Sequence, residues 1–249
     1  MRLANKIAII TGGGGGFGEG IAQRFAAEGA KVAVVDLRGD EADRVARAIG
    51  SQAIALQADV GSPDDVKRVI SETSSRLGRP DILVNNAGTT HKNKPILEVT
   101  EEEFDRMFRV NVKSIYLFVR EVAPVMRDGG GGVILNVGST AGTRPRPGLT
   151  WYNATKGAVN LVSKSLAVEL APWKIRVSCI SPVMGETGML ADFMGVPDTP
   201  ENRARFLGTI PLGRLSRPSD IANAALYLAS DEAEFITGVD FPVDGGRSV

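Results

Sequence analysis

The stretch from Asn136 to Lys156 reads N-V-G-S-T-A-G-T-R-P-R-P-G-L-T-W-Y-N-A-T-K and joins two regular elements across a turn rich in glycine and proline. It begins inside an apolar run, Gly132–Val137, which predicts a strand, and a helical pattern starts at about Trp151. Residues four positions apart share one face of a helix, so Tyr152 and Lys156 are expected to lie side by side. The stretch therefore brings a phenol and an amine to the carboxyl edge of a predicted sheet.

Ser139, at the end of the predicted strand, completes a trio with a chemical use. A free phenol, with a pKa of about 10, is a poor base at neutral pH, but a nearby ammonium favours the phenolate. We therefore expect Lys156 to lower the pKa of Tyr152, so that the phenol exchanges a proton with an alcohol or carbonyl oxygen that Ser139 holds. A Tyr and a Lys at this spacing are also common as an ordinary surface pair, so the interpretation needs a hydride carrier elsewhere in the chain.

Strand-like runs alternate with helical patterns on both sides of this stretch, most of them continuously apolar, as in strands covered on both faces. The predicted strands are Ile7–Ile10, Lys31–Asp36, Ala53–Asp59, Asp81–Asn85, Gly132–Val137, Ile175–Ser181 and Val239–Asp244. The predicted helices cover about 17–28, 40–49, 62–77, 101–127, 151–171 and 218–230. This order predicts an α/β fold, a doubly wound, Rossmann-like three-layer sandwich with a seven-stranded parallel sheet, and one domain over residues 1–249.

Composition narrows the class of protein. The 29 basic residues balance 29 acidic ones, so nothing points to a nucleic-acid surface, and the 43% of hydrophobic residues suffice for a large core. No apolar run is long enough to span a bilayer, and the first strand leaves no room for a signal peptide, so we expect a cytoplasmic protein. The single cysteine, Cys179, lies in an apolar run and is expected to be a buried thiol; no metal site is expected.

The first predicted strand leads into T-G-G-G-G-G-F-G, Thr11–Gly18, and a helix opens at once. Glycines at such a junction let the backbone turn tightly and approach a pyrophosphate at the helix N-terminus. The second strand ends in Asp36, whose carboxylate can bind both hydroxyls of an adenosine ribose and would repel a 2′-phosphate. Leu37 follows where a basic residue would favour NADP, so we expect NAD, although Arg38 could reach a phosphate.

Other polar groups fall at the same edge of the predicted sheet. Asp59 and Val60 end the third strand, where a carboxylate could meet the adenine amino group, and N-N-A-G at 85–88 ends the fourth. His91, the only histidine, stands in a polar loop, and a solvated side chain is the expected outcome. The segment 186–212, rich in proline and glycine, is expected to be an irregular loop that covers the substrate.

Two of the predicted helices carry unusual residues. Asn111 interrupts the helix 101–127, where a polar side chain has little local purpose. The helix 151–171 has two apolar stripes, Ala154–Ala158–Leu161–Val168 and Val159–Val162–Leu166–Leu170. A helix of a monomer buries one face, so the second stripe is expected to pack against another subunit.

Together these residues resemble the short-chain dehydrogenase/reductase family in its ordinary one-domain form. The resemblance covers Thr11 to Gly246, and its motifs are jointly specific. They are T-G-x-x-x-G-x-G at 11–18, N-N-A-G at 85–88, Asn111, Ser139, Y-x-x-x-K at 152–156 and V-D-G-G at 243–246.

The resemblance implies a role for each matching residue. Tyr152 would be the acid/base, Lys156 would lower its pKa and bind the nicotinamide ribose, Ser139 would orient the substrate oxygen, and Asn111 would hold a water that relays protons. The implied cofactor-binding set is Gly12, Gly15, Gly16, Phe17, Gly18, Asp36, Leu37, Asp59, Val60, Asn86, Ala87, Gly88, Tyr152, Lys156, Pro182, Val183, Gly185 and Thr187. A homotetramer built on the two long helices is also implied.

The sequence departs from the family pattern after the sixth predicted strand. The usual Pro-Gly, followed two residues later by a branched aliphatic residue, is replaced by Pro182-Val183 with Gly185 at the aliphatic position. Contacts made by the backbone alone would survive this change, and Thr187 still matches the usual threonine.

The leading hypothesis is an NAD-dependent dehydrogenase that interconverts a secondary alcohol and a ketone. A 3-oxoacyl-thioester reductase using NADPH is the alternative, and Asp36 argues against it. A non-catalytic NAD-binding protein is disfavoured because the full catalytic set is present, and a sugar-nucleotide epimerase or dehydratase usually has a larger carboxyl-terminal domain. The substrate stays open among polyols, sugars, hydroxy acids and cyclic alcohols. Arg144 or Arg146, between Ser139 and Tyr152, could meet an anionic substrate, or each could be a solvated loop arginine.

Overall fold

A single parallel sheet forms the centre of the protein in the computed structural model, which describes all 249 residues. Its strands are β1 (Ile7–Thr11), β2 (Lys31–Asp36), β3 (Ala53–Gln57), β4 (Ile82–Asn85), β5 (Gly132–Val137), β6 (Ile175–Pro182) and β7 (Asp240–Val243). They lie in the order β3-β2-β1-β4-β5-β6-β7, and each neighbouring pair is parallel. The predicted fold class and number of strands are confirmed.

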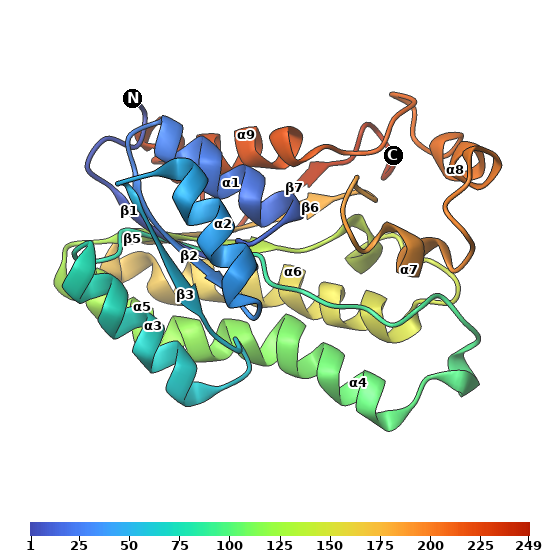
Figure 1. Cartoon of the computed structure of the whole chain (residues 1–249), viewed down its shortest axis with the longest axis horizontal. Coiled ribbons are helices and arrows are strands. Elements are labelled where there is room, and N and C mark those ends of the chain that lie inside the picture. The colour runs from blue at the N-terminus through green and yellow to red at the C-terminus, as the bar shows by residue number, and fades with distance from the viewer.

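Helices cover both faces of this sheet (Figure 1). The first face carries α1 (Gly16–Ala27), α2 (Gly39–Ile49) and α9 (Pro218–Ala229). The second carries α3 (Pro63–Arg76), α4 (Glu101–Phe108), α5 (Ser114–Asp128) and α6 (Thr150–Leu170). Two large buried clusters, of 25 and 20 residues, fill the spaces between these layers. The strands are continuously apolar because each strand side faces one of these two cores.

The direction of winding reverses beside β1, which pairs with β2 on one side and with β4 on the other. The chain first builds β1, β2 and β3 outward and then crosses back to add β4 to β7 in the other direction. In open α/β sheets, ligands bind at such a reversal, outside the carboxyl ends of the strands. The fold therefore places the crevice where Thr11, Asp36, Asn85 and Val137 end their strands.

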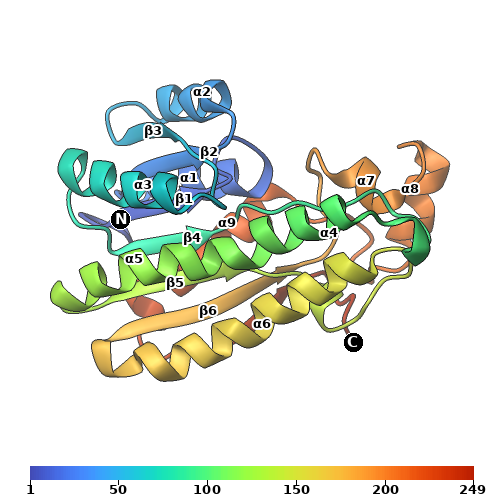
Figure 2. The same cartoon turned by 90° about the horizontal axis from the view of Figure 1, so that it is seen from below.

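The predicted irregular insert contains two short helices instead, α7 (Leu190–Met194) and α8 (Pro200–Leu207). The sequence already carries the start of α8, since Pro200 occupies the first turn and the Thr199 side chain accepts a hydrogen bond from the Asn202 N–H at 3.3 Å. Figures 1 and 2 show both helices beyond the carboxyl end of the sheet, with the C-terminus on the same side.

The predicted helix 101–127 is also divided, because a π-helical turn, Arg109–Lys113, separates α4 from α5. Thr100 and Glu103 form a capping box at the start of α4. The third strand ends at Gln57, two residues before Asp59, so Asp59 and Val60 lie on the loop that follows it. None of the helices combines the length and the apolar character that a membrane span requires.

Candidate active site

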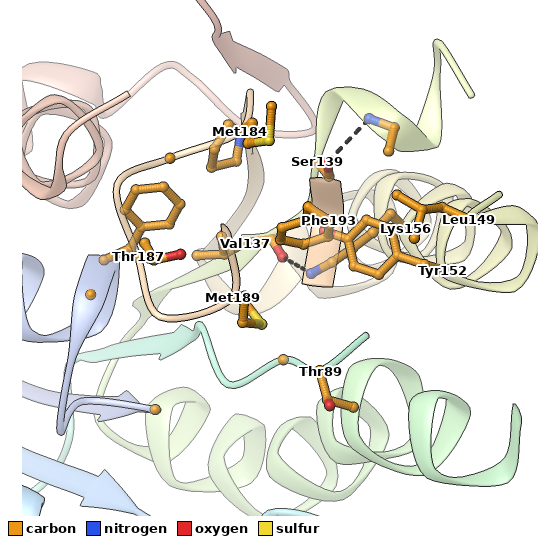
Figure 3. Close-up of a pocket in the computed structure, with 18 of the residues that line it drawn as sticks. Thr89, Val137, Ser139, Leu149, Tyr152, Lys156, Met184, Thr187, Met189 and Phe193 are labelled. Atoms are coloured by element: carbon orange, nitrogen blue, oxygen red, sulfur yellow. Dashed lines mark hydrogen bonds between the residues drawn. The ribbon is translucent and has the colours of Figure 1, made fainter. Parts of the chain in front are cut away.

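One cavity of about 1030 Å³ lies along the carboxyl edge of the sheet and takes in nearly all of the predicted site residues (Figure 3). Its glycine end is lined by the loop 12–17 together with Asp36 and Asp59. Its insert end is lined by the loop 144–149, by residues of the segment 183–210 and by Arg247. Ser139, Tyr152 and Lys156, the three residues predicted to carry the proton chemistry, also line the cavity.

The glycine end is shaped by residues that cannot carry side chains. Gly12 and Gly16 have positive φ angles, +62° and +53°, that favour glycine. A Cβ on Gly18 would overlap the carbonyl oxygen of Gly12. Gly15 immediately precedes α1, whose first backbone N–H groups have no partner within the helix and can receive an anion.

Thr11 and Asn86 hold this loop against the neighbouring strand. The Thr11 hydroxyl accepts hydrogen bonds from the backbone N–H groups of Asn86 and Ala87, both at 3.0 Å. The Asn86 side-chain amide donates to the carbonyl oxygens of Thr11 and Gly12, at 2.9 and 3.1 Å. The loop is therefore locked to β4 from both directions. Asn86, Ala87 and Gly88 line the cavity here. Gly18 does not line it but packs closely against Gly12.

Asp36 faces the glycine loop at the end of β2. Its carboxylate accepts hydrogen bonds from the backbone N–H groups of Gly14 and Arg38, both at 3.0 Å. The Arg38 guanidinium lies 3.9 Å from the same carboxylate and is largely exposed, and Leu37 is exposed beside it. Asp36 and Leu37 both line the cavity, so the expected ribose-binding carboxylate is held in place by the backbone.

Asp59 has a partner that the sequence analysis missed. Arg109, from the π-helical turn, donates to the Asp59 carboxylate at 2.6 Å, and the Gly61 N–H donates to its other oxygen at 2.8 Å. Partial burial by itself would raise the pKa of Asp59, but these hydrogen bonds outweigh burial and lower it. Arg109 and Val60 also line the cavity. A 50-residue separation hides this ion pair from local sequence patterns.

Asn111 owes its position to the same π-helical turn. Its side-chain oxygen accepts from the Thr89 N–H at 2.8 Å, and its amide donates to the Thr89 carbonyl at 2.9 Å and to the Thr155 hydroxyl at 3.0 Å. Asn111 is buried and stands close to Lys156, since a Cβ on Gly88 would lie 3.5 Å from the Asn111 oxygen and 3.6 Å from the Lys156 ammonium. Single π-helical turns are frequent at functional sites.

Ser139, Tyr152 and Lys156 converge as predicted from the end of β5 and the first turns of α6 (Figure 3). Tyr152 and Lys156 are both buried, with 6% and 5% of their surface exposed. The Lys156 ammonium donates to the Val137 carbonyl at 2.8 Å and lies 5.8 Å from the centre of the Tyr152 ring. Ser139 lines the cavity, and its hydroxyl accepts a hydrogen bond from the Ala141 N–H at 3.1 Å.

The predicted lowering of the Tyr152 pKa is wrong, because burial outweighs the nearby groups that would lower it. Burial raises the pKa of Tyr152 to about 12, and the Ser139 hydroxyl and the Arg146 charge only partly oppose this rise. Burial also lowers the pKa of Lys156 to about 8. Desolvation penalises the charged form of both groups, and the ammonium is directed at the Val137 carbonyl instead of the phenol.

The segment after β6 closes over the glycine loop in spite of its unusual sequence. Gly185 forms a β-bridge with Ser216, and a Cβ at Gly185 would overlap the Phe17 ring. The ring therefore fills the space that the family's aliphatic side chain would need. Thr187 packs against Gly16, with its methyl carbon 3.2 Å from where a Cβ would stand. Pro182, Val183, Gly185 and Thr187 all line the cavity.

The prediction of a solvated His91 is wrong, because this side chain is 1% exposed. Its Nδ1 lies 2.8 Å from the Lys92 carbonyl, and its Nε2 has no protein partner. The loop folds inward because the Asn93 N–H bonds to the Asp192 carbonyl and the Lys94 N–H to the Gly148 carbonyl. Cys179 is a buried free thiol, as predicted, and burial raises its pKa to about 11.

Arg144 and Arg146 both line the insert end of the cavity. Arg144 is exposed and donates from its guanidinium to the Arg247 carbonyl. Arg146 is half-buried and donates to the Phe193 carbonyl at 3.4 Å. Arg205 and Arg247 also line this end, and the sequence analysis missed both because no motif marks them.

Comparison with known proteins agrees with this architecture. The family model described as enoyl-(acyl carrier protein) reductase matches residues 13–248. The chain belongs to the short-chain dehydrogenase/reductase family. It is accordingly an oxidoreductase that transfers a hydride between a secondary alcohol or its ketone and a nicotinamide cofactor.

Individual relatives cover the whole chain. The 4-formylbenzenesulfonate dehydrogenase TsaC1/TsaC2 of Comamonas testosteroni is 49% identical, with 100% of both chains aligned. Secoisolariciresinol dehydrogenase of Forsythia intermedia is 38% identical over 100% of this chain and 91% of that protein. A crystal structure of 3-ketoacyl-(acyl-carrier-protein) reductase from Brucella melitensis complexed with NADH superposes with a TM-score of 0.94 at 49% identity, over 99% of this chain and 100% of that one.

Proposed function

We propose that the cofactor is NAD and that Ser139, Tyr152, Lys156 and Asn111 carry out the proton chemistry of a secondary-alcohol dehydrogenase. One observation carries the proposal: Ser139, Tyr152 and Lys156 line the same cavity as the glycine loop and the Asp36 carboxylate. The residues fit a dinucleotide, since Gly12, Gly15 and Gly16 line the cavity at the N-terminus of α1 and Asp36 lines it at the end of β2. When bound, the nicotinamide ring would accept the hydride from the alcohol carbon.

Discrimination between NAD and NADP is assigned to Asp36. Its carboxylate is already held by two backbone N–H groups, so it cannot turn away to admit a phosphate without losing them. A second anion beside a partly buried carboxylate is unfavourable. The Brucella melitensis reductase was crystallised as a complex with NADH, which supports the same choice.

In the oxidation direction, Tyr152 would take the proton from the alcohol while Ser139 holds the same oxygen by a hydrogen bond. Lys156 and Asn111 lie next to each other behind Tyr152, and a water held by Asn111 would pass the proton outward. Because burial raises the pKa of Tyr152, a positive charge would have to favour the phenolate during turnover. Lys156, one turn further along α6, supplies that positive charge.

An NAD-reduction screen against secondary alcohols and hydroxy acids, repeated with NADP, tests this proposal. We expect turnover with NAD and at least about tenfold lower kcat/KM with NADP, as expected for loss of one charge-assisted hydrogen bond. A clear preference for NADP would contradict the role of Asp36. Cofactor binding without turnover across the whole panel would favour the non-catalytic alternative.

Oxidation of an aldehyde through its hydrate is a second candidate, favoured by the name of the Comamonas testosteroni relative, which specifies a formyl group. A hydrated aldehyde presents a hydroxyl on the carbon that loses the hydride, so Tyr152 and Ser139 would act as they do on an alcohol. The reduction of a 3-oxoacyl thioester is the third candidate, because the family model and the Brucella melitensis protein are both named as reductases of acyl carrier protein substrates. Including an aryl aldehyde and acetoacetyl-CoA in the screen separates the three reactions.

We further propose that the protein is a homotetramer. Leu161 and Val168, from one predicted stripe of α6, are 67% and 77% exposed, and Tyr116 of α5 is 57% exposed. Exposed apolar side chains on two long helices of the same face suit a subunit interface. Light scattering of wild type and Leu161→Glu would test it, with a smaller particle expected for the variant. The cytoplasmic location stays a prediction.

A further inference from the structure

The two ends of the cavity differ in charge, because each carboxylate of the glycine end has an arginine beside it and the arginines of the insert end have no carboxylate. Among its lining residues the only carboxylates are Asp36 and Asp59, which follow β2 and β3 at the glycine end. The insert end has four arginines, Arg144, Arg146, Arg205 and Arg247, and none of them forms an ion pair within 4.0 Å. Of the other arginines that line the cavity, Arg109 pairs with Asp59 at 2.6 Å and Arg38 lies 3.9 Å from Asp36. Arg106, on α4, donates to the Thr90 carbonyl at 3.1 Å.

Arg146 is the arginine of this group with the most deeply placed guanidinium. It donates to the Phe193 carbonyl at 3.4 Å and approaches the Met184 sulfur at 3.7 Å, and its guanidinium carbon lies 5.3 Å from the centre of the Phe206 ring. A guanidinium has five N–H donors, and two long contacts to neutral atoms leave most of them free. Burial lowers the pKa of Arg146, and the nearby Arg247 lowers it further. The protein itself supplies no anion for this charge.

Arg247 and Arg144 add to the same positive region. The Arg144 guanidinium donates to the Arg247 carbonyl, which ties the C-terminal segment to the loop after β5. Asp244 is the acidic group near Arg247, but its two oxygens already accept hydrogen bonds from the Gly246 and Ser248 N–H groups, at 3.0 and 2.8 Å. Burial and the charge of Arg144 lower the pKa of Arg247, and Asp244 opposes them.

Apolar side chains connect this positive region to the reacting groups. The rings of Tyr152 and Phe193 pack edge to face with their centres 5.0 Å apart, and the carbonyl of the same Phe193 accepts from Arg146. Leu149, Met184 and Met189 line the cavity around them (Figure 3). A ligand whose hydroxyl meets Tyr152 would therefore lay its body along rings and thioethers and end at Arg146.

We propose that Arg146, supported by Arg247, binds an oxyanion of the substrate, and that the substrate is an alcohol or aldehyde with a flat apolar body and a carboxylate or sulfonate at its far end. This inference rests on the proposed dehydrogenase function and adds the substrate class to it. A planar guanidinium matches either oxyanion with two parallel hydrogen bonds. The anion would also relieve the repulsion between Arg146 and Arg247.

The test compares two substrates of the same shape, 4-(1-hydroxyethyl)benzoate and 4-(1-hydroxyethyl)benzamide, on wild type, Arg146→Gln, Arg146→Lys and Arg247→Gln. Arg203→Gln is the matched control, because Arg203 lies on α8 but pairs with Asp198 outside this cavity. Wild type should prefer the carboxylate. Arg146→Gln should lower kcat/KM for it by about 10- to 100-fold, mostly through KM, and Arg247→Gln by less. Arg146→Lys should recover part of the loss, and amide turnover should stay within about threefold throughout.

A binding measurement separates this inference from the proposed chemistry. Calorimetric titration of the NAD-loaded enzyme with 4-ethylbenzoate and 4-ethylbenzamide, which have no hydroxyl to oxidise, should show tighter binding of the carboxylate in wild type and in Arg203→Gln. This preference should be lost in Arg146→Gln and partly kept in Arg146→Lys and Arg247→Gln. Thermal unfolding of each variant shows that it is folded. Equal binding of the two ligands by wild type would overturn the anion site. A loss confined to acetoacetyl-CoA in Arg146→Gln would also overturn it and assign the arginines to a thioester carrier. Absence of turnover with intact carboxylate binding would contradict the dehydrogenase function instead.

Discussion

The glycine end and the insert end of the cavity are built in different ways. At the glycine end, backbone N–H groups hold the Asp36 carboxylate, Arg109 holds the Asp59 carboxylate, and missing side chains set the shape. At the insert end, methionine and phenylalanine side chains form the wall and four arginines have no ionic partner. The charged groups of the first end are paired within the protein, whereas the second holds a half-buried arginine, Arg146, that has no carboxylate partner.

This contrast matches a division of labour within one domain. A dinucleotide presents the same groups in every turnover, so a rigid wall of strand ends and glycines serves it well. Substrates differ between relatives, and the insert that surrounds them is a separate segment with two short helices of its own. The mutations below act on the glycine end, on the insert, or on the wall formed by Ser139, Tyr152 and Lys156.

Tyr152→Phe should have the largest effect, because it removes the proton acceptor and keeps the edge-to-face packing on Phe193. We expect kcat to fall by about 10²- to 10⁴-fold, as is typical for loss of general acid–base catalysis. Steady-state kinetics measures this, and fluorescence titration with NADH should show that the variant still binds the cofactor. A variant that oxidises alcohols as fast as wild type would refute the assigned chemistry.

Asp36→Asn combined with Leu37→Arg should act at the glycine end alone. The pair removes the carboxylate that binds the ribose hydroxyls and adds a cation for a 2′-phosphate. We expect the ratio of kcat/KM for NAD to that for NADP to fall by about 10- to 100-fold, with KM for the alcohol unchanged. Arg38→Gln is the control, since Arg38 already stands in the same turn. A ratio that stays constant would place discrimination on other residues.

A pair of glycine substitutions compares the rigidity of the two ends. A Cβ at Gly18 would overlap the Gly12 carbonyl oxygen, whereas a Cβ at Gly188, in the insert, would meet nothing within 4 Å. Gly18→Ala should lower the free energy of unfolding by about 1–3 kcal/mol and weaken NADH binding, because the glycine loop must shift. Gly188→Ala should change neither by more than about 0.5 kcal/mol. Denaturant unfolding and NADH titration of both variants measure these effects. If Gly18→Ala changes neither quantity, the glycine loop is flexible enough to accept a side chain there.

Much of the fold follows from the sequence because the fold depends on local patterns. Seven apolar runs separated by helical patterns leave few topologies once crossovers are short and right-handed. The residues at strand ends, such as Asp36, and those at helical spacing, such as Tyr152 and Lys156, reach the cavity for the same reason. What was missed depends on contacts between distant segments, including the Arg109–Asp59 ion pair and the burial of His91.

Charge effects were harder to predict than positions. Spacing places Lys156 beside Tyr152, but it does not say how deeply the pair is buried or which acceptor the ammonium chooses. Burial, which raises the pKa of Tyr152 to about 12, depends on the whole wall of the cavity. The arginines at the insert end show the same limit, since Arg247 joins Arg146 from the far end of the chain.

The smallest predicted effect is the contribution of the buried Lys156 amine to the pH dependence of stability. Burial lowers the pKa of Lys156 from its ordinary 10.5 to about 8. Between these values the unfolded chain holds a proton on this amine and the folded chain does not. Because stability rises with pH wherever the unfolded state binds more protons, Lys156 should make the folded protein more stable as the pH rises through this window. The Asp59 carboxylate at the glycine end has a lowered pKa, because Arg109 and the Gly61 N–H donate to it, and it should contribute no slope in this window.

Comparison with Lys156→Met isolates this slope from the opposite contributions of Tyr152 and Cys179, whose raised pKa values reduce stability at alkaline pH. The free energy of unfolding of wild type, minus that of the variant, should rise by about 1–2 kcal/mol between pH 7.5 and 9.5. Urea unfolding at five pH values measures the difference. Asp59→Asn should give a line parallel to wild type over the same range, because the pKa of Asp59 is lowered away from this window. If the Lys156→Met line is parallel as well, the amine keeps its proton in the folded protein, and an anion or water inside the catalytic wall must stabilise it.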